Sequence, residues 1–315
     1  MEPGIIERTD ASRIAIGKWP TPVRFLERTS NLLGTEVWAK LEEECAAWGG
    51  NKVRKLEFIF HELRAAQVER FVAWGAATSN WVASAAWHGS KLGFEVAVGL
   101  GGHLPDDYRR IYETIGCPLV VLPHIELAPL AASIARARIG LRARILPVGG
   151  SGGAGDVGST RAGAEIAGDI ASGRMPQPSD VFVATGTCGT VAGLSVGMGI
   201  SGCASSIVAV KVADWPFGTR AMIERRRRNL ATRLQEAAGE DRTPALVRFE
   251  SDFLGRGYGR PTPESRAAIV IARRDGLHLD GTYGAKAFAA LVAATGAGAG
   301  PFLFVHTSPG PPPVG

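Results

Sequence analysis

Apolar positions along this chain follow two alternating spacings. From residue 52 onward, Leu56, Ile59 and Leu63 recur every three or four positions, which predicts a helix. Between residues 70 and 148, short apolar runs alternate with longer segments of helical spacing. The predicted strands are residues 70–74, 94–100, 118–122 and 144–148, and the predicted helices are residues 80–92, 105–115 and 127–139. Short strands separated by helices predict a parallel sheet that is covered on both faces.

A glycine-rich segment, residues 149–155, interrupts this alternation with five glycines in seven residues. It suits a hinge, a close approach of backbone to a ligand, or a plain linker. Beyond it the predicted strands are residues 180–184, 206–212, 245–248 and 302–306, and the predicted helices are residues 158–171, 189–199, 217–238, 263–275 and 283–294. We therefore expect an α/β protein with two lobes, each a mostly parallel twisted sheet flanked by helices. Residues 59–149 would form the small domain, and residues 1–58 with 150–315 the large one.

The composition is that of a folded protein with a large core. Of its 315 residues, 45% are hydrophobic and 21% are charged, and this length allows two lobes. The net charge is +5 and the pI about 9.2, with six of the 35 basic residues at Lys211, Arg220 and 225–228. The run 225–228 lies in a polar predicted helix, which favours a solvated face over nucleic-acid binding. The remaining charges are dispersed and favour small anionic ligands.

The cysteines and histidines are not spaced like disulfide partners or metal ligands, so neither kind of site is expected. These residues are Cys45, Cys117, Cys188, Cys203, His61, His88, His103, His124, His278 and His306. The first residues carry no basic-then-apolar signal, and no apolar run approaches the length of a membrane span. A cytoplasmic protein without membrane partners is therefore expected.

Two lysines stand three residues apart where a pair of glycines leads into the first strong helix. Gly49 and Gly50 permit a tight backbone entry, and Lys52 falls at the start of the helix. The helix N-terminus and the nearby cation of Lys55 both disfavour a second positive charge, so we expect a lowered pKa for Lys52. A partly neutral amine can attack an aldehyde and hold it as a Schiff base. The alternative is an ordinary basic first turn with solvated lysines.

Two turns connect a predicted strand to a predicted helix, which is where open α/β sheets bind ligands. One comprises residues 75–80. The other, residues 185–190, reads Thr-Gly-Thr-Cys-Gly-Thr and offers backbone N–H groups, hydroxyls and a helix N-terminus without a bulky side chain. Such a cradle suits a phosphate, although it lacks the Lys-Ser or Lys-Thr of a nucleoside-triphosphate loop. The alternative for either turn is an ordinary helix cap.

The lysine motif, the small α/β lobe and the phosphate turn together resemble the fold type II, tryptophan-synthase-β-like pyridoxal-phosphate enzymes. Within that group, residues 49–57, Gly-Gly-Asn-Lys-Val-Arg-Lys-Leu-Glu, are similar to a motif of the 1-aminocyclopropane-1-carboxylate deaminase and D-cysteine desulfhydrase family. Further similar segments follow in the family's order between residues 21 and 307. They are residues 78–80, 147–151, 185–193, 258–259, 283–286 and 306–307.

The resemblance implies a role for each matching residue. Lys52 would form the Schiff base with pyridoxal 5′-phosphate and move the α-proton of the substrate. Ser79 would face the substrate carboxylate or act on a reacting hydrogen, and Tyr258 and Tyr283 would flank the substrate or modulate Lys52. An alternative for Tyr258 is simple packing with a satisfied hydroxyl. The residues expected to bind the cofactor are Lys52, Asn51, Lys55, Asn80, Thr187, Cys188, Gly189, Thr190 and Thr307.

Within this set the resemblance also implies which part of the cofactor each group would meet. Lys55 and the turn 187–190 would hold the phosphate, and Asn80 would hydrogen-bond the phenolic oxygen. Thr307 would meet the pyridine nitrogen with a neutral hydroxyl, which weakens the electron sink and favours rapid loss of a β-leaving group. The small domain would close over the substrate.

The chain departs from the family pattern at several positions. Gly284 stands where a deaminase that opens the cyclopropane ring is expected to have a glutamate, which argues against ring opening. The family's closing His-Thr-Gly-Gly is replaced after Thr307 by Ser308 and Pro309. Trp81 follows Asn80 where the family has His or Gln, which predicts either a bulkier, more aromatic pocket or a core-facing tryptophan.

The predicted function is that of a pyridoxal-phosphate-dependent lyase or deaminase. The reaction would be α,β-elimination on a small amino acid with a β-leaving group, as in a D-cysteine desulfhydrase, giving ammonia and a 2-oxo acid. The alternatives are a β-replacement synthase, a 1-aminocyclopropane-1-carboxylate deaminase and a non-catalytic metabolite-binding relative. The expected partners are a small amino-acid substrate and a second copy of the chain in a homodimer.

Overall fold

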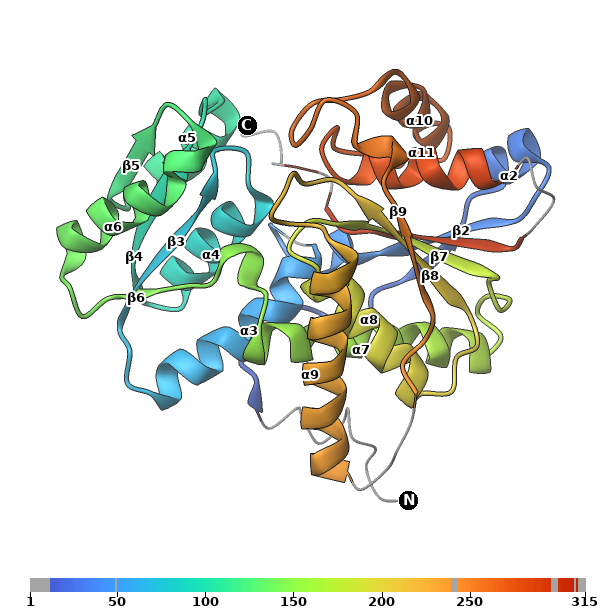
Figure 1. Cartoon of the computed structure of the whole chain (residues 1–315), viewed down its shortest axis with the longest axis horizontal. Helices are drawn as coiled ribbons and strands as arrows, with labels where there is room; N and C mark the ends of the chain where they lie inside the picture. Colours follow the sequence, from blue (N-terminus) through green and yellow to red (C-terminus); the bar gives the residue numbers. More distant parts are fainter. Residues whose placement is uncertain (1–11, 49, 239–242, 296–299, 309, 311–315) are drawn as a thin grey trace.

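The chain folds into two twisted sheets that lie side by side, each flanked by helices (Figure 1). The computed structural model describes residues 12–48, 50–238, 243–295, 300–308 and 310. Gly49 of the lysine motif and Pro309 lie outside the described residues. The arrangement confirms the predicted α/β architecture with two mostly parallel lobes.

The larger sheet has the strand order β1-β2-β10-β7-β8-β9, in which only β1 runs antiparallel to its neighbour among the described strands. Its strands are β1 (Val23–Phe25), β2 (Val37–Leu41), β7 (Asp180–Thr185), β8 (Ser206–Lys211), β9 (Val247–Glu250) and β10 (Phe302–His306). Its helices are α2 (Glu27–Leu33), α7 (Gly153–Ala171), α8 (Gly189–Ile200), α9 (Arg220–Ala238), α10 (Pro263–Arg273) and α11 (Gly284–Ala294). The short elements before residue 42 have no equivalent in the sequence prediction.

The smaller sheet has the order β5-β4-β3-β6, and all its described strands are parallel. Its strands are β3 (Arg70–Ala76), β4 (Glu95–Gly101), β5 (Leu119–Leu122) and β6 (Arg144–Ile145), with helices α4 (Asn80–Lys91), α5 (Asp106–Ile115) and α6 (Ala128–Ile139). Phe71 and Ala73 of β3 belong to a hydrophobic cluster with α4, while Val72 faces α6. Both faces are therefore buried, as the continuous apolar runs predict.

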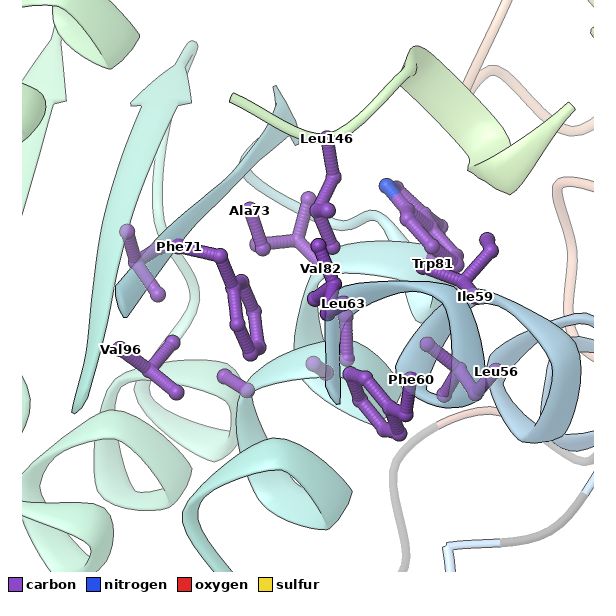
Figure 2. Close-up of a cluster of buried hydrophobic side chains, with 14 of the residues drawn as sticks. Leu56, Ile59, Phe60, Leu63, Phe71, Ala73, Trp81, Val82, Val96 and Leu146 are labelled. Carbon is purple, nitrogen blue, oxygen red and sulfur yellow. The ribbon is translucent and has the colours of Figure 1, made fainter. Parts of the chain in front are cut away.

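Helix α3 (Asn51–Ala65) joins the two lobes through a shared hydrophobic cluster. Figure 2 shows Phe60 and Leu63 of α3 beside Phe71 of the small sheet and Trp81 of α4. The same cluster includes Leu230 of α9, which belongs to the large lobe. The predicted domain boundary at residue 58 falls inside this helix, so α3 is a packing element common to both lobes.

The start of α3 is fixed against the end of β10. The Asn51 N–H donates to the carbonyl oxygen of Thr307 at 2.9 Å. Gly50 has φ +115°, and a Cβ on it would lie 2.4 Å from the same carbonyl oxygen, so a larger residue would both strain the backbone and clash. The glycine of the lysine motif thus places Lys52 next to the carboxyl end of the large sheet.

A buried ionic cluster holds the first turn of α3 from behind. Arg54 is 2% exposed and pairs with Glu42 at 2.6 Å and with Glu165 of α7 at 2.7 Å, and Lys40 of β2 also pairs with Glu165 at 3.1 Å. The carboxylates raise the pKa of the Arg54 guanidinium further above its usual range despite burial. Removing one partner of such a cluster leaves an uncompensated buried charge, so the helix start is held strongly.

The glycine-rich segment differs from its prediction. Strand β6 ends at Ile145, residues 148–150 form a 3₁₀ turn, and α7 begins at Gly153 instead of residue 158. A Cβ on Gly149 would lie 2.3 Å from Thr187 Oγ1, and one on Gly150 would lie 2.4 Å from the Trp81 ring. The segment is therefore a place of close packing, because side chains from both lobes occupy the space that a Cβ would need.

The arginine run in α9 is not uniformly solvated, which corrects the sequence prediction. Arg225 and Arg228 are exposed, but Arg226 and Arg227 are half-buried. Arg227 donates to Ser195 of α8 at 2.9 Å, and Arg226 pairs with Asp156 of α7 at 3.1 Å. Two of the four arginines therefore hold α9 onto the large lobe. No described helix is long and apolar enough to cross a membrane.

Candidate active site

A cavity of about 300 Å³ opens at the carboxyl ends of β3, β7, β8 and β10. Residues from both lobes line it. The predicted site residues in its wall are Asn51, Lys52, Ser79, Asn80, Thr187, Cys188, Gly189, Thr190, Tyr258, Tyr283 and Thr307. Lys55, the remaining predicted residue, lies directly behind the phosphate turn. Residues as far apart in the sequence as Asn51 and Thr307 thus converge on one place, as the strand-end rule predicts.

Lys52 has the lowered pKa that catalysis by an amine requires. Burial is the largest cause, the charge of Lys55 adds to it, and Asp156 opposes it, so that the pKa of Lys52 falls to about 7. The sequence predicts the direction from Lys55 and the helix N-terminus, but not that desolvation dominates. At neutral pH the Lys52 amine is therefore neutral in a large fraction of the molecules, and in this form it can act as a nucleophile or base.

The phosphate turn forms a cradle between β7 and α8. Lys55 Nζ donates to Ser151 Oγ at 2.8 Å, and Ser151 Oγ lies 2.7 Å from Thr187 Oγ1. Gly189 opens α8, and a Cβ on it would lie 2.5 Å from Ser151 Oγ and 2.6 Å from Lys55 Nζ. The missing side chain brings a cation, two hydroxyls and a helix N-terminus into one small volume, which is the donor set that a phosphate requires.

The neighbouring residues support the turn in different ways. Asn51 Nδ2 donates to Thr190 Oγ1 at 2.8 Å and so ties the start of α3 to the start of α8. Cys188 has φ +67°, an uncommon conformation for a residue with a side chain. Its thiol lies 3.6 Å from the carbonyl oxygen of Gly186, and burial raises the thiol pKa. Cys188 therefore contributes backbone geometry to the cradle and not a thiolate.

Ser79 and Asn80 lie at the start of α4, on the small-lobe side of the cavity. Ser79 is the N-cap residue of the helix and is 8% exposed. Asn80 Oδ1 accepts a hydrogen bond from the Tyr108 hydroxyl of α5 at 2.7 Å. Because this contact uses the amide oxygen, the amide NH₂ is left to donate to an acceptor in the cavity. Such an acceptor matches the phenolic oxygen that the resemblance places there.

Tyr258 and Tyr283 form a pair. Their hydroxyl oxygens are 2.7 Å apart, and their rings meet edge to face at a centroid distance of 5.8 Å. Burial raises the pKa of Tyr258 to about 12, with the Tyr283 hydroxyl opposing the shift, and it raises the pKa of Tyr283 well above its usual value. Both phenols are therefore protonated at neutral pH.

Thr307 and Gly284 lie on the large-lobe side. Thr307 follows β10 and is 5% exposed in the cavity wall. Gly284 begins α11, where its N–H donates to Asp280 Oδ2 at 3.0 Å. A Cβ on Gly284 would lie 3.4 Å from that oxygen. The position thus carries no acid of its own.

Two tryptophans give the cavity an apolar character. Trp81 is 2% exposed, belongs to the core cluster and also lines the cavity. The interpretation as a core-facing tryptophan and the interpretation as a pocket residue therefore both apply. Trp74 lines the same wall and donates its indole N–H to the Leu146 carbonyl oxygen at 2.8 Å. The small-lobe wall of the cavity therefore includes two aromatic side chains, Trp74 and Trp81.

Several residues of the site were not predicted from the sequence. Tyr108 orients Asn80, Ser151 links Lys55 to Thr187, and Asp156 lies beside Gly189. Ser151 belongs to a segment that resembles the family, and this signal could have identified it. Tyr108 lies within an ordinary helical pattern, and Asp156 lies between the glycine-rich segment and the predicted helix 158–171. Neither carries a local signal, because their roles depend on contacts between distant segments.

The comparisons with known proteins agree with this geometry. The family model described as pyridoxal-phosphate dependent enzyme matches residues 14–308. The chain belongs to this family. It is 32% identical over 310 residues to a D-cysteine desulfhydrase from Yersinia enterocolitica and 31% identical over 311 residues to one from Klebsiella pneumoniae. These matches cover 92% and 93% of this chain, respectively, and 92% of each relative.

Solved structures show the same relationship. The crystal structure of an ACC deaminase homologue matches with a TM-score of 0.83 and 27% identity, covering 98% of this chain and 95% of that chain. The processed form of threonine deaminase isoform 2 from Solanum lycopersicum shares the fold, with a TM-score of 0.65 and 15% identity over 91% of this chain and 83% of that chain. The chain is thus a fold type II enzyme, a lyase or deaminase that depends on pyridoxal phosphate.

The residues around the cavity fit this cofactor. Lys52 would carry it covalently, the cradle of Lys55, Ser151 and Gly189 would hold its phosphate, and Asn80 would donate to its phenolic oxygen. When bound, pyridoxal phosphate draws electron density from the α-carbon of an amino acid. The residues of the cavity wall would supply the base and the orienting donors.

Proposed function

We propose that this enzyme catalyses α,β-elimination on a small amino acid with a leaving group on Cβ, and that D-cysteine is the first substrate to test. Support comes from one observation above all: Lys52, Ser79 and the Tyr258–Tyr283 pair meet at one cavity, while Gly284 carries no acid. The D-cysteine desulfhydrase relatives favour the same reaction.

Each side chain has a defined task in this reaction. Lys52, with its pKa near 7, accepts the α-proton of the substrate at Nζ. The Cβ–S bond then breaks, its electron pair leaves with sulfur, and the thiolate takes a proton to depart as hydrogen sulfide. The released 2-aminoacrylate tautomerises and is hydrolysed to pyruvate and ammonia. No oxidant or reductant is consumed.

Ser79 and the tyrosine pair would orient the substrate in the cavity that Lys52 also lines. Ser79 at the N-terminus of α4 would hold the substrate carboxylate, because a helix N-terminus favours an anion. Tyr258 and Tyr283 remain protonated at neutral pH and would donate to the departing group. Tyr258 is fixed from behind, since its backbone N–H donates to Asp214 Oδ2 at 2.9 Å.

Ring opening of 1-aminocyclopropane-1-carboxylate is disfavoured because position 284 is a glycine and supplies no acid. In a ring-opening deaminase an acid is expected at this position, near the pyridine nitrogen, where Thr307 here supplies a neutral hydroxyl. Without the acid, the electron sink is weaker and loss of a good β-leaving group is favoured over a long-lived carbanion.

We also propose that residues 59–149 act as a small domain that closes over the substrate, and that two copies of the chain form a homodimer in the cytoplasm. The small-lobe position of Ser79 and Asn80, opposite the phosphate cradle, supports closure. Sedimentation analysis of the purified protein tests the dimer.

A substrate panel tests the reaction. The three amino acids D-cysteine, L-cysteine and 3-chloroalanine are incubated with the purified enzyme, and 1-aminocyclopropane-1-carboxylate is incubated in parallel. The 2-oxo acid is measured with and without an added thiol nucleophile. We expect pyruvate from at least one of the three, unchanged by the nucleophile. Formation of a substituted amino acid at the expense of pyruvate would show β-replacement instead, and 2-oxobutyrate from 1-aminocyclopropane-1-carboxylate alone would show ring opening.

A further inference from the structure

An ion pair that the reaction does not use lies directly behind the phosphate cradle. Asp156 of α7 is 4% exposed, and its Oδ2 accepts from Arg226 Nη1 of α9 at 3.1 Å. The Arg226 side chain is 17% exposed, in contrast to Arg225 and Arg228 at the two ends of the run, which are exposed. The pair therefore connects two helices of the large lobe at the back of the cofactor site.

The second oxygen of Asp156 points into the cradle. Asp156 Oδ1 makes no hydrogen bond with the described part of the chain. A Cβ on Gly189 would lie 2.2 Å from this oxygen and 2.6 Å from Lys55 Nζ, so both charges converge on the start of α8. A buried carboxylate oxygen without a partner is costly. Its position is explained if nearby cations balance its charge.

The charge balance at this point decides how well a phosphate can bind. A lone carboxylate beside the cradle would repel a phosphate dianion, and Arg226 is placed to neutralise it. Asp156 and Arg226 act in opposite directions on the charge of Lys55, and Lys55 in turn acts on Lys52. Burial lowers the pKa of Lys55 to about 8, Asp156 opposes this shift and Arg226 adds to it.

We propose that Asp156 and Arg226 are a positioning pair that sets the net charge around Lys55 and thereby the affinity of the enzyme for the phosphate of its cofactor. This proposal rests on the binding of the cofactor phosphate at the cradle, and is independent of which amino acid is the substrate. It also gives the half-buried arginine of α9 a function beyond helix packing.

The test uses the full-length protein, freed of cofactor, and measures binding of pyridoxamine 5′-phosphate and of inorganic phosphate. Neither probe can form a covalent bond with Lys52, so the affinities report on the cradle. The variants are Arg226→Gln, Asp156→Asn and the double variant. Arg228→Gln is the matched control, because it removes the same charge from an exposed position of the same helix.

Arg226→Gln should weaken binding of pyridoxamine 5′-phosphate by about tenfold, the factor that corresponds to one pKa unit, because Asp156 is then unbalanced and draws Lys55 away from the phosphate. The double variant should recover most of this loss, since neither charge remains. Arg228→Gln should bind like the wild type.

The pH dependence separates a charge effect from a packing effect. Lys55 contributes to phosphate binding while it is protonated, so affinity should fall as the pH rises through about 8. Asp156→Asn removes the group that raises this pKa and should move the fall to lower pH. Arg226→Gln removes a group that lowers it and should move the fall to higher pH.

Two results would overturn the proposal: equal affinities for Arg226→Gln and Arg228→Gln, or losses that simply add in the double variant. A wild-type protein that binds neither probe would overturn the placement of the phosphate and the pair's role with it. A protein that binds both probes and yet forms no 2-oxo acid from D-cysteine, L-cysteine or 3-chloroalanine would overturn only the proposed elimination.

Discussion

Removing the hydroxyl of Tyr108 in α5 should lower the affinity of the enzyme for its cofactor, although Tyr108 acts only through Asn80. Tyr108 is 7% exposed and donates its hydroxyl to Asn80 Oδ1 at 2.7 Å. Tyr108→Phe leaves that buried amide oxygen without its partner, which costs about 1–3 kcal/mol. If the Asn80 amide loses its orientation toward the phenolic oxygen of the cofactor, the affinity for pyridoxal phosphate should fall by about 5- to 140-fold, at about 1.4 kcal/mol for each factor of ten.

Tyr112 provides a matched control for this prediction. It lies one turn further along α5, is 1% exposed, and its hydroxyl makes no hydrogen bond with the described residues. Pyridoxal phosphate is titrated into the protein freed of cofactor, and binding is followed by absorbance. The affinity should be weaker for Tyr108→Phe and unchanged for Tyr112→Phe. Equal affinities for the two variants would refute the view that Tyr108 orients Asn80.

Three other predictions address different parts of the site. The rate at which the protein freed of cofactor captures pyridoxal phosphate should rise as the pH increases through about 7, because Lys52 is a neutral nucleophile above its pKa. A midpoint of this rise near pH 10 would contradict the prediction. Gly189→Ala should abolish cofactor retention, since its Cβ would lie 2.2 Å from a carboxylate oxygen, while Gly168→Ala, which meets open space on α7, should retain it. Ser79→Ala should keep the cofactor spectrum and lower kcat/KM by about 10² or more, whereas Thr307→Ala should change the spectrum or the cofactor affinity; the reverse pattern would reassign both residues.

Much of the site was predictable because its residues occur in short, ordered segments. The lysine motif with Gly50 predicts a tight backbone entry into a helix, and the turn 185–190 predicts a cradle at the start of the next helix, now α8. Both follow from local chemistry: glycine where the backbone approaches another chain segment, and free N–H groups at a helix N-terminus.

The parts that could not be predicted depend on long-range contacts. Tyr108 and Asn80 are 28 positions apart, and Asp156 and Arg226 are 70 positions apart. Neither helix pattern reveals which face meets which partner. The arginine run shows the limit well, because four identical residues differ in burial according to the helical phase of α9.

The same limit applies to the energetics of Lys52. Its neighbours in the sequence predict the direction of its pKa shift, but the dominant cause is burial, which arises only when the cavity walls from both lobes are assembled. The early strands β1 and β2 were missed for a related reason, since they are short and owe their stability to pairing with one another and with β10.

The most direct test of the proposed activity is the product balance from D-cysteine in the wild-type enzyme and in Lys52→Ala. Elimination requires ammonia and pyruvate in equal amounts, together with hydrogen sulfide, and it requires the Lys52 amine. We predict equal yields of ammonia and pyruvate from the wild type and neither product from Lys52→Ala. A wild-type enzyme that retains its cofactor but releases neither product, or a Lys52→Ala variant that releases both at the wild-type rate, would contradict the account.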